Sequence, residues 1–461
     1  MNGYHIAGLG VILALIVGLS ICSGRKTAVQ MQGFSAPVVS GLIMGTLVGG
    51  SSTIGTAQLA FSYGMSAWWF TLGGGIACAV LAVVYAKPLR RSGCATLVGI
   101  LSKEYGAAAG LTASVLNGVG TFINIISQLI SASAVLAVVF PSMGILTAVL
   151  VSALLMLLYV LFGGARGAGM VGILKMVLLS ATMLSCGILV LWLTDGPAGW
   201  VRMVKELQHA EGIHFFSLFA RGVGVDLGSG LSLILGVLTT QTYAQAVISG
   251  RTDRAAVRGG LACALMIPPV GLGGILVGLY MRASFPHIDP KTALTTFIMK
   301  YMPAFPAGIM LGVLFIAVVG TGAGLALGIA SMLHNDVLKN LRSHALPDLK
   351  NRAIFSCTIA LVLTLACCFS TGALGDLILQ FAYMSLALRG AVVLAPLCGA
   401  LWFSGRIAPQ FAITAILLGP LCVFLFTALI PLPFDALFVG IAAAMIAMIV
   451  GLLLTTKSTD A

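Results

Sequence analysis

Five polar residues recur at intervals of three and four within one strongly apolar segment of the chain, near residues 113–138. They are Asn117, Thr121, Asn124, Gln128 and Ser131. This spacing places them on one face of a helix, where amide groups that faced lipid would lose their hydrogen bonds. The face must therefore contact protein or a water-filled path. We predict that Asn124 and Gln128 bind a polar solute, with hydrogen bonding between helices as the alternative.

An arginine lies in the middle of another apolar segment, within the stretch AYMSLALRGAVVLAP. A charge at such a position costs about 3 kcal/mol on insertion scales, so Arg389 is expected to have a function. Its guanidinium can bind a substrate carboxylate through two parallel hydrogen bonds. Two alternatives stay open. Arg389 lies at the cytoplasmic mouth of its span, or it binds backbone carbonyl groups.

Two further charged residues are assigned ordinary roles. Asp226 is placed at the outer end of its apolar segment, where we expect a solvated carboxylate. A buried carboxyl that carries a proton is the alternative at that position. Lys175 lies one to two turns inside a span, and we expect its long side chain to extend its ammonium group to the membrane surface.

The sequence shows none of the common residue patterns that support catalysis. The chain has no glycine-rich nucleotide loop ending in Lys-Ser or Lys-Thr, no intramembrane zinc motif, and no pair of membrane acids placed for acid–base chemistry. We therefore predict no catalytic residues and no ATP-driven pump. The net charge of +12 suggests nucleic-acid binding, but its distribution between loops argues against that interpretation.

The elements that must position these side chains follow from composition. Of 461 residues, 59% are hydrophobic and only 8% are charged, whereas a soluble domain has about 25% charged residues. Apolar runs of about 20 residues recur along the chain, and each is long enough to cross a bilayer as a helix. We predict an all-α polytopic membrane protein with about thirteen spans. They are placed near 6–22, 36–62, 65–86, 113–138, 145–163, 168–193, 226–249, 257–281, 303–333, 352–370, 375–403, 408–429 and 434–454.

Basic residues alternate sharply between the loops that this assignment defines. One side of the membrane receives sixteen of the 24 Lys and Arg residues, the other side receives six, and Lys175 and Arg389 fall inside spans. Because the basic side is cytoplasmic, we predict a multi-pass protein of the inner (plasma) membrane with its N-terminus outside and its C-terminus inside. The segment 6–22 lacks a preceding Lys or Arg, which favours a retained span over a cleaved signal peptide.

Glycine and serine cluster at matching places in two spans. The second span contains Gly49-Gly50-Ser51-Ser52, and the seventh contains Gly228-Ser229-Gly230. Such clusters break a helix, and breaks in corresponding spans of two halves indicate an inverted-repeat transporter with a midplane site. Close helix packing through small residues is the alternative. We predict two five-helix repeats and substrate contacts from Ser51 and Ser52. The divisions are 1–35, 36–193, 194–225, 226–403 and 404–461, namely a peripheral helix with a loop, the first repeat, an outer loop, the second repeat, and two peripheral helices with a tail.

At this point the chain resembles the sodium:solute symporter family. The resemblance rests on three stretches in order along the chain: TIGTAQLAFSYGMSAWW in the second span, QTYAQAVISGRTDRAAVRGG after the seventh, and AVVGTGAGLALGIASMLHND in the ninth, which ends at Asp336. The family binds sodium between its first and eighth core helices through backbone carbonyls and two side-chain hydroxyls.

The resemblance implies a sodium site made by the carbonyl groups of Gly45, Val48 and Ala317 and the hydroxyl of Thr321. The second hydroxyl position is Gly320, which has no side chain. Because a hard cation requires a shell of oxygen atoms, this departure leaves a gap. A bound water that fills it, a proton as the coupling ion, and the loss of coupling are the three alternatives.

The resemblance and the polar residues together predict a cation-coupled secondary transporter, with Na⁺ as the leading coupling ion, that imports a small polar solute by alternating access. Arg389 and the amide face favour a carboxylate or an amino acid. A proton-coupled or uncoupled transporter and a solute-sensing membrane protein of the same fold are the alternatives. The expected partners are a small-molecule solute and the lipid bilayer, with no nucleic acid and no obligate protein partner.

Overall fold

A computed structural model describes residues 3–24, 33–333, 348–372, 378–429 and 434–459, and Asp336 lies outside these ranges. Within them the regular elements are all helices, joined by turns and loops, and one isolated bridge pairs Phe34 with Gly250. No strand occurs in the described ranges. The prediction of an all-α fold is therefore confirmed.

The helices and their bounds are as follows. In chain order they are α1 (Gly3–Gly24), α2 (Ala36–Leu47), η1 (Ser51–Gly55), α3 (Thr56–Tyr63), η2 (Gly64–Trp68), α4 (Trp69–Val80), η3 (Leu81–Tyr85), α5 (Ala86–Arg91), α6 (Leu97–Tyr105), α7 (Ala107–Val139), α8 (Ile145–Leu193), α9 (Gly196–Glu211), α10 (Val223–Leu238), α11 (Gln241–Ile248), α12 (Asp253–Ser284), η4 (Pro290–Thr292), α13 (Ala293–Tyr301), α14 (Ala304–Met332), α16 (Asp348–Gly372), α17 (Ile378–Trp402), α18 (Pro409–Ala428) and α19 (Leu437–Thr459).

Fewer of the described helices are long enough to cross a membrane than the sequence predicted. Among the described residues, eight helices are long and apolar enough to cross a bilayer, and the bent pair α10 and α11 makes a ninth. The predicted count of thirteen is not confirmed. Part of the difference arises because shorter apolar stretches, such as Ala36–Leu47 in α2, do not reach the length of a full span alone.

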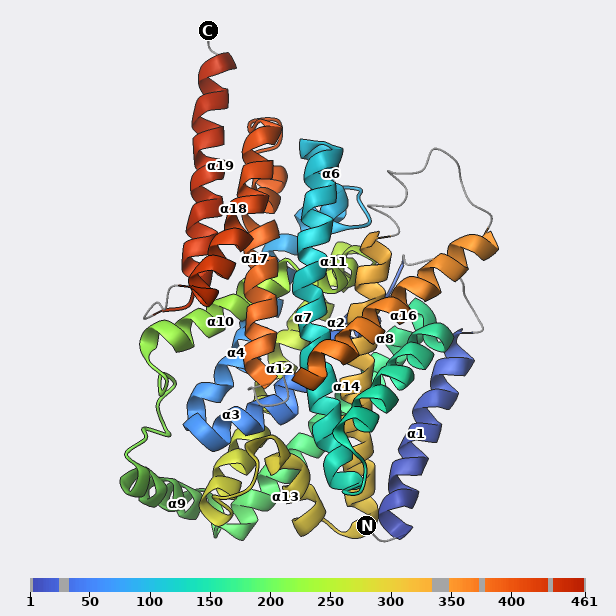
Figure 1. Ribbon diagram of the computed structural model, residues 1–461, viewed down its shortest axis with the longest axis vertical. Helices are drawn as coiled ribbons and strands as arrows, with labels where there is room; N and C mark the ends of the chain where they lie inside the picture. The colour runs from blue at the N-terminus through green and yellow to red at the C-terminus, as the bar shows by residue number, and fades with distance from the viewer. Residues whose placement is uncertain (1–2, 25–32, 334–347, 373–377, 430–433, 460–461) are drawn as a thin grey trace.

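Helices α7 and α14 form the centre of the bundle, as Figure 1 shows. Within the most apolar stretch of each helix, 83% of α14 and 78% of α7 is buried, against 33% for α18 and for α19. The latter two therefore lie at the periphery, where their apolar side chains face outward. The amide face predicted on residues 113–138 belongs to the buried helix α7, and all five of its polar residues are buried.

Helix α8 covers both of the spans predicted at 145–163 and 168–193. A straight helix would separate Tyr159 from Lys175 by about 24 Å. Both side chains nevertheless lie within 4.0 Å of the point where a Cβ atom on Gly320 would stand. Helix α8 is therefore not straight between these residues, and side chains from both of its parts reach Gly320 on α14.

The first helix break lies where the glycines and serines predicted it. Helix α2 ends at Leu47 because Val48 adopts an extended conformation (φ −92°, ψ 101°). The chain resumes as a π-helix at Ser51 and as α3 at Thr56. Ser52 stabilises the break locally, since its hydroxyl accepts a hydrogen bond from the Gly49 amide at 2.8 Å.

The second break is real but lies ten residues later than predicted. Helix α10 continues through Gly228-Ser229-Gly230, and the bend of 47° falls at Thr239 and Thr240, between α10 and α11. The glycines serve close packing instead: a Cβ atom on Gly230 would stand 2.5 Å from the Trp69 ring. The adjacent threonines break the helix because β-branched residues are stiff and their hydroxyls bond backbone carbonyls, here those of Leu235 and Gly236.

Candidate functional site

The first break is closed by a side chain from the centre of α7. The Gly50 amide donates a hydrogen bond to Oε1 of Gln128 at 3.0 Å. Glycine is required on the α2 side of this contact. A Cβ atom on Gly49 would lie 2.5 Å from Oγ1 of Thr321, and one on Gly50 would lie 2.3 Å from Cβ of Ser131. The glycines thus let the broken backbone approach α7 and α14 closely.

Three of the five predicted substrate residues, Gln128, Ser51 and Asn124, are joined by hydrogen bonds at this break. Nε2 of Gln128 donates to Oγ of Ser51 at 3.2 Å and to Oδ1 of Asn124 at 3.4 Å. The Ser51 hydroxyl is also 3.0 Å from that of Ser127, which donates to the carbonyl of Ile378 on α17. The result is a buried chain of hydrogen bonds between η1, α7 and α17. Ser52 is not part of it, because its hydroxyl is engaged with Gly49.

Arg389 lies at the second break, away from this cluster. Its side chain is fully buried, and its Nη1 donates to the Thr240 hydroxyl at 2.8 Å. Nη2 and Nε donate to the hydroxyl and the carbonyl of Ser385, at 3.0 Å and 3.2 Å. The ion pairs of the described residues include no carboxylate partner for Arg389. Binding to a backbone carbonyl was one of the alternatives left open for this residue, and the bond from Nε to the Ser385 carbonyl is a contact of that kind.

Helix α7 joins the two breaks. Gly120 packs directly on Arg389, because a Cβ atom there would lie 2.7 Å from Cγ of the arginine. Asn124 and Gln128 follow at one and two turns, and Gln128 reaches the first break. Eight residues of helix span about 12 Å. One buried face of α7 therefore connects a guanidinium at one break to a hydrogen-bonded group of amides and hydroxyls at the other.

The predicted cation ligands converge on the same region of the first break. Oγ1 of Thr321, on α14, lies 3.4 Å from the carbonyl oxygen of Gly45 and 3.5 Å from that of Val48. Ala317 is buried one turn before Thr321. The end of α2 and the middle of α14 are thus in contact, as a cation bridging them requires.

The prediction for Lys175 was wrong. Its side chain is 3% exposed and does not extend to the membrane surface. Nζ instead donates to the carbonyl of Gly45 at 2.6 Å and to Oγ1 of Thr321 at 2.8 Å. The reason is the packing of α8 against α2 and α14, which places the root of this lysine beside the end of α2.

These contacts decide whether a sodium ion fits the predicted ligands. Sodium requires several oxygen atoms, and this region supplies them. Two of the four predicted ligands, however, bind the ammonium group of Lys175. Two unit charges about 4 Å apart repel by about 4 kcal/mol at an effective dielectric constant of about 20. A sodium ion therefore does not fit among these atoms while Lys175 stays in place.

A small cavity adjoins the lysine. It has a volume of about 40 Å³ and is lined by Gly45, Tyr159, Lys175 and Gly320, among others. Since a cavity needs about 10–15 Å³ on this measure to hold one water molecule, this space has room for water. Gly320, where a hydroxyl was expected, faces this cavity without a side chain.

Asp226 also differs from the prediction. The residue is fully buried, so the expectation of a solvated carboxylate was wrong. Its carboxylate binds Arg221, with a shortest nitrogen–oxygen distance of 2.6 Å, and it accepts a further hydrogen bond from the Arg221 amide at 3.0 Å. The preceding loop folds over the start of α10, and this brings the arginine to the acid.

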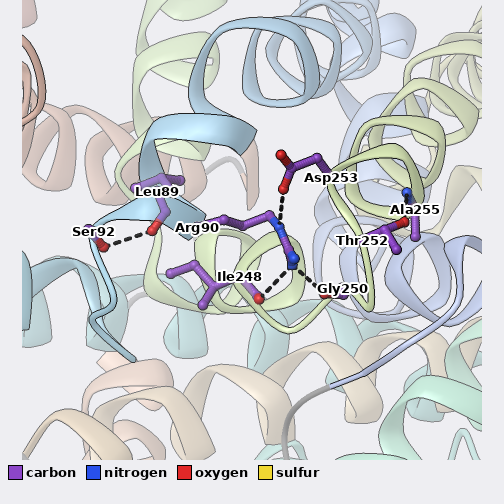
Figure 2. A network of polar contacts seen from close by, with 8 residues as sticks. All are labelled: Leu89, Arg90, Ser92, Ile248, Gly250, Thr252, Asp253 and Ala255. Atoms are coloured by element: carbon purple, nitrogen blue, oxygen red, sulfur yellow. Dashed lines mark hydrogen bonds and ion pairs between the residues drawn. The ribbon is translucent and has the colours of Figure 1, made fainter.

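A second polar network was not found from the sequence, where its arginine served only as a topology signal. Figure 2 shows Arg90, from α5, reaching the connection between α11 and α12. Its Nε binds Asp253 at 2.7 Å, and its Nη1 donates to the carbonyls of Ile248 and Gly250. The backbone bridge of Phe34 to this same connection adds two hydrogen bonds. The segments that flank both broken helices are thereby tied together at one end of the bundle.

The sequence of a known protein family matches most of this chain. The family model of the sodium:solute symporter family matches residues 31–419. The high-affinity choline transporter 1 of Drosophila melanogaster is 25% identical over 363 residues, which cover 71% of this chain and 55% of that protein. The uncharacterized symporter YwcA of Bacillus subtilis (strain 168) is 28% identical over 192 residues, or 39% of this chain and 37% of that protein. The chain thus spans about half the length, or less, of these relatives.

Solved structures share the fold. A Na⁺-coupled sialic acid symporter, in a substrate-bound outward-open state, superposes with a TM-score of 0.80 at 15% identity and covers 98% of this chain and 97% of its own. Mhp1, a nucleobase-cation-symport-1 family transporter in a closed conformation with bromovinylhydantoin bound, gives a TM-score of 0.63 at 11% identity, with coverage of 93% and 94%. The predicted fold class, an all-helical transporter fold with broken helices, is confirmed.

Proposed function

The chain belongs to the sodium:solute symporter family of membrane transporters and is not an enzyme, and from this premise we propose that it is a cation-coupled secondary transporter that imports a small polar solute by alternating access. Transport of this type requires a site near the middle of the membrane that two states expose to opposite sides. The two helix breaks, joined by the buried face of α7, supply such a site. The direction of import and the plasma membrane as its location belong to the same proposal.

The single observation that carries the substrate class is the guanidinium of Arg389. It is fully buried at the second break, and no described carboxylate pairs with it. Three of its five N–H groups have the partners described above, which leaves two for a ligand. A carboxylate accepts two parallel hydrogen bonds from such a group. We therefore favour a solute with a carboxylate, such as an amino acid or another small organic acid.

The relatives suggest opposite charges for the solute. Choline, named for the Drosophila relative, is a cation, whereas sialic acid, named for the structural neighbour, carries a carboxylate. A cationic solute next to Arg389 would be repelled in a buried, low-dielectric site. The amide and hydroxyl groups of Asn124, Gln128 and Ser51 would bind the uncharged polar part of the solute. This arrangement favours the anion.

Sodium is the coupling ion that family membership supports, and a Na⁺-coupled structural neighbour supports it further. Coupling requires that ion and solute each bind one of the two states more tightly than the other. Closure of the chain around Arg389 in the present structure is consistent with such a cycle, because a buried guanidinium can meet a solute only after a change of state.

Counterflow of labelled solutes into proteoliposomes tests the proposal. We expect uptake of one or more small carboxylates above that of protein-free vesicles, and no uptake by the Arg389→Met variant. Since replacing an unpaired buried charge with an apolar side chain is often neutral or stabilising, the variant should keep or raise its melting temperature. Arg258→Met, the same change at an exposed position of α12, is the matched control. Wild-type-like uptake by Arg389→Met would exclude the assigned role, and no uptake of any solute by the wild-type chain would exclude transport.

A further inference from the structure

The end of α2 presents a backbone carbonyl that lacks its helical partner. In a continuous helix, the carbonyl of Gly45 would accept a hydrogen bond from the amide of Gly49. That amide instead binds the Ser52 hydroxyl at 2.8 Å, because the helix ends at Leu47. The last carbonyl groups of a helix also carry the negative end of its dipole. This end of α2 therefore attracts a positive charge.

The positive charge that meets it belongs to the chain itself. Nζ of Lys175 lies 2.6 Å from the Gly45 carbonyl and 2.8 Å from the Thr321 hydroxyl, and the residue is almost completely buried. No ion pair with Lys175 occurs among the described residues. A buried ammonium group is stable only where acceptors replace its water. Here the carbonyl, the hydroxyl and the helix end provide that replacement.

Close to this ammonium group, the sequence departs from the pattern expected for a sodium site. Gly320, the second hydroxyl position expected for a sodium site, has no side chain, and a Cβ atom there would stand 4.0 Å from Nζ of Lys175. One oxygen ligand is thus missing at the same place where a positive group has been added. The two changes compensate each other, because an ammonium group needs fewer acceptors than a sodium ion needs ligands.

We propose that the ε-ammonium of Lys175 is the resident cation of this site and that it bridges α2 and α14 in place of a sodium ion. Sodium then does not bind between Gly45 and Thr321. Any sodium ion that drives transport by this chain binds elsewhere, so the inference rests on the proposed function only for the site's place in a transporter. The lysine makes the bridge from α8, which adds a third helix to the contact between α2 and α14.

Melting temperatures of the purified full-length chain in Na⁺ and in K⁺, at equal ionic strength, test this without a substrate. A ligand that binds only the folded state raises the melting temperature. In the wild-type background, Thr321→Ala is expected to leave any difference between the Na⁺ and K⁺ values unchanged. If Thr321→Ala abolishes a sodium-specific shift, sodium binds at this hydroxyl beside the lysine, and the proposal is overturned.

The second arm of the experiment restores the expected ligands. K175A/G320S removes the ammonium group and adds the missing hydroxyl, for which the structure has room, since the nearest neighbour of the new Cβ atom is the Tyr159 hydroxyl at 3.7 Å. We expect sodium to raise its melting temperature by several degrees over potassium. K175A/G320A, which differs only by that oxygen atom, should show a smaller shift, and adding Thr321→Ala to K175A/G320S should remove the shift.

A folded K175A/G320S protein without a sodium-specific shift would overturn the proposal, because the lysine would not then stand in for an ion. If this variant does not fold, the wild-type and Thr321→Ala pair still decides the matter, since it leaves Lys175 in place. Failure of counterflow leaves these melting temperatures unaffected. The counterflow experiment can therefore contradict the proposed transport function without affecting the proposal for Lys175, and the melting temperatures can contradict the proposal for Lys175 without affecting the transport function.

Discussion

The amide oxygen of Gln128 accepts a hydrogen bond from the Gly50 amide at 3.0 Å, and the same side chain donates to Ser51 at 3.2 Å. One residue of α7 thus satisfies a backbone donor and a hydroxyl at two consecutive positions where the chain resumes after the first helix break. The break is therefore held by a side chain that is distant in sequence.

Replacing this side chain should destabilise the break. Gln128→Ala leaves the buried Gly50 amide without an acceptor, a loss of about 1–3 kcal/mol. We expect a lower melting temperature together with reduced uptake. Ser133→Ala is the control on the same helix, because that hydroxyl bonds only its own helix, at the carbonyl of Ile130. Equal behaviour of the two variants would show that Gln128 has no particular role at the break.

The close approach of Gly50, at the start of η1, to α7 gives a prediction of compensation. In Gly50→Ala, the new Cβ atom would stand 2.3 Å from Cβ of Ser131, an atom that cannot move without its backbone. We expect strong destabilisation and loss of uptake, and we expect the double variant G50A/S131G to recover much of both. Gly118→Ala, with nothing within 4 Å of the added atom, should be neutral or stabilising by up to about 1 kcal/mol. A double variant no better than Gly50→Ala would contradict this explanation.

The Arg90 network predicts unequal effects for its two partners. Arg90→Ala removes the ion pair with Asp253 and the hydrogen bonds to the carbonyls of Ile248 and Gly250. Asp253→Asn removes only the charge of one partner, and such partly exposed pairs contribute about 0.2–1 kcal/mol. We therefore expect Arg90→Ala to lower the melting temperature more than Asp253→Asn, with a double-mutant cycle that gives a small coupling energy. Similar effects from both single variants would show that the carbonyl contacts do not contribute.

The spans and the first break were predictable because both rest on local properties. Apolar runs mark membrane helices, and a run of two glycines and two serines disfavours a helix wherever it occurs. The residues on one face of α7 were predictable for the same reason, since their spacing fixes their direction. Asn124, Gln128 and Ser51 are indeed brought together. Their contact with a solute stays a prediction.

The remaining features depend on which helices become neighbours. Helix α10 continues through Gly228-Ser229-Gly230, where Gly230 packs on the large Trp69 ring and Gly228 on Asp435, contacts that no local pattern reveals. Lys175 is buried because α8 packs against α2 and α14, and Asp226 is buried because Arg221 folds over it. One signal was available for the lysine. A missing hydroxyl at Gly320 and an unpaired lysine within a span are two anomalies that explain each other.

The hydrogen bonds of Lys175 have a consequence for the energetics of transport. A group tethered to its site by its own side chain is present at an effective concentration set by geometry, whatever the composition of the solution outside. The side chain itself never crosses from one compartment to the other, so any work drawn from an electrochemical gradient comes from a species that does cross, such as a cation or a proton. The lysine can hold α2 against α14, but the energy that concentrates a solute must enter this protein through a different bound species.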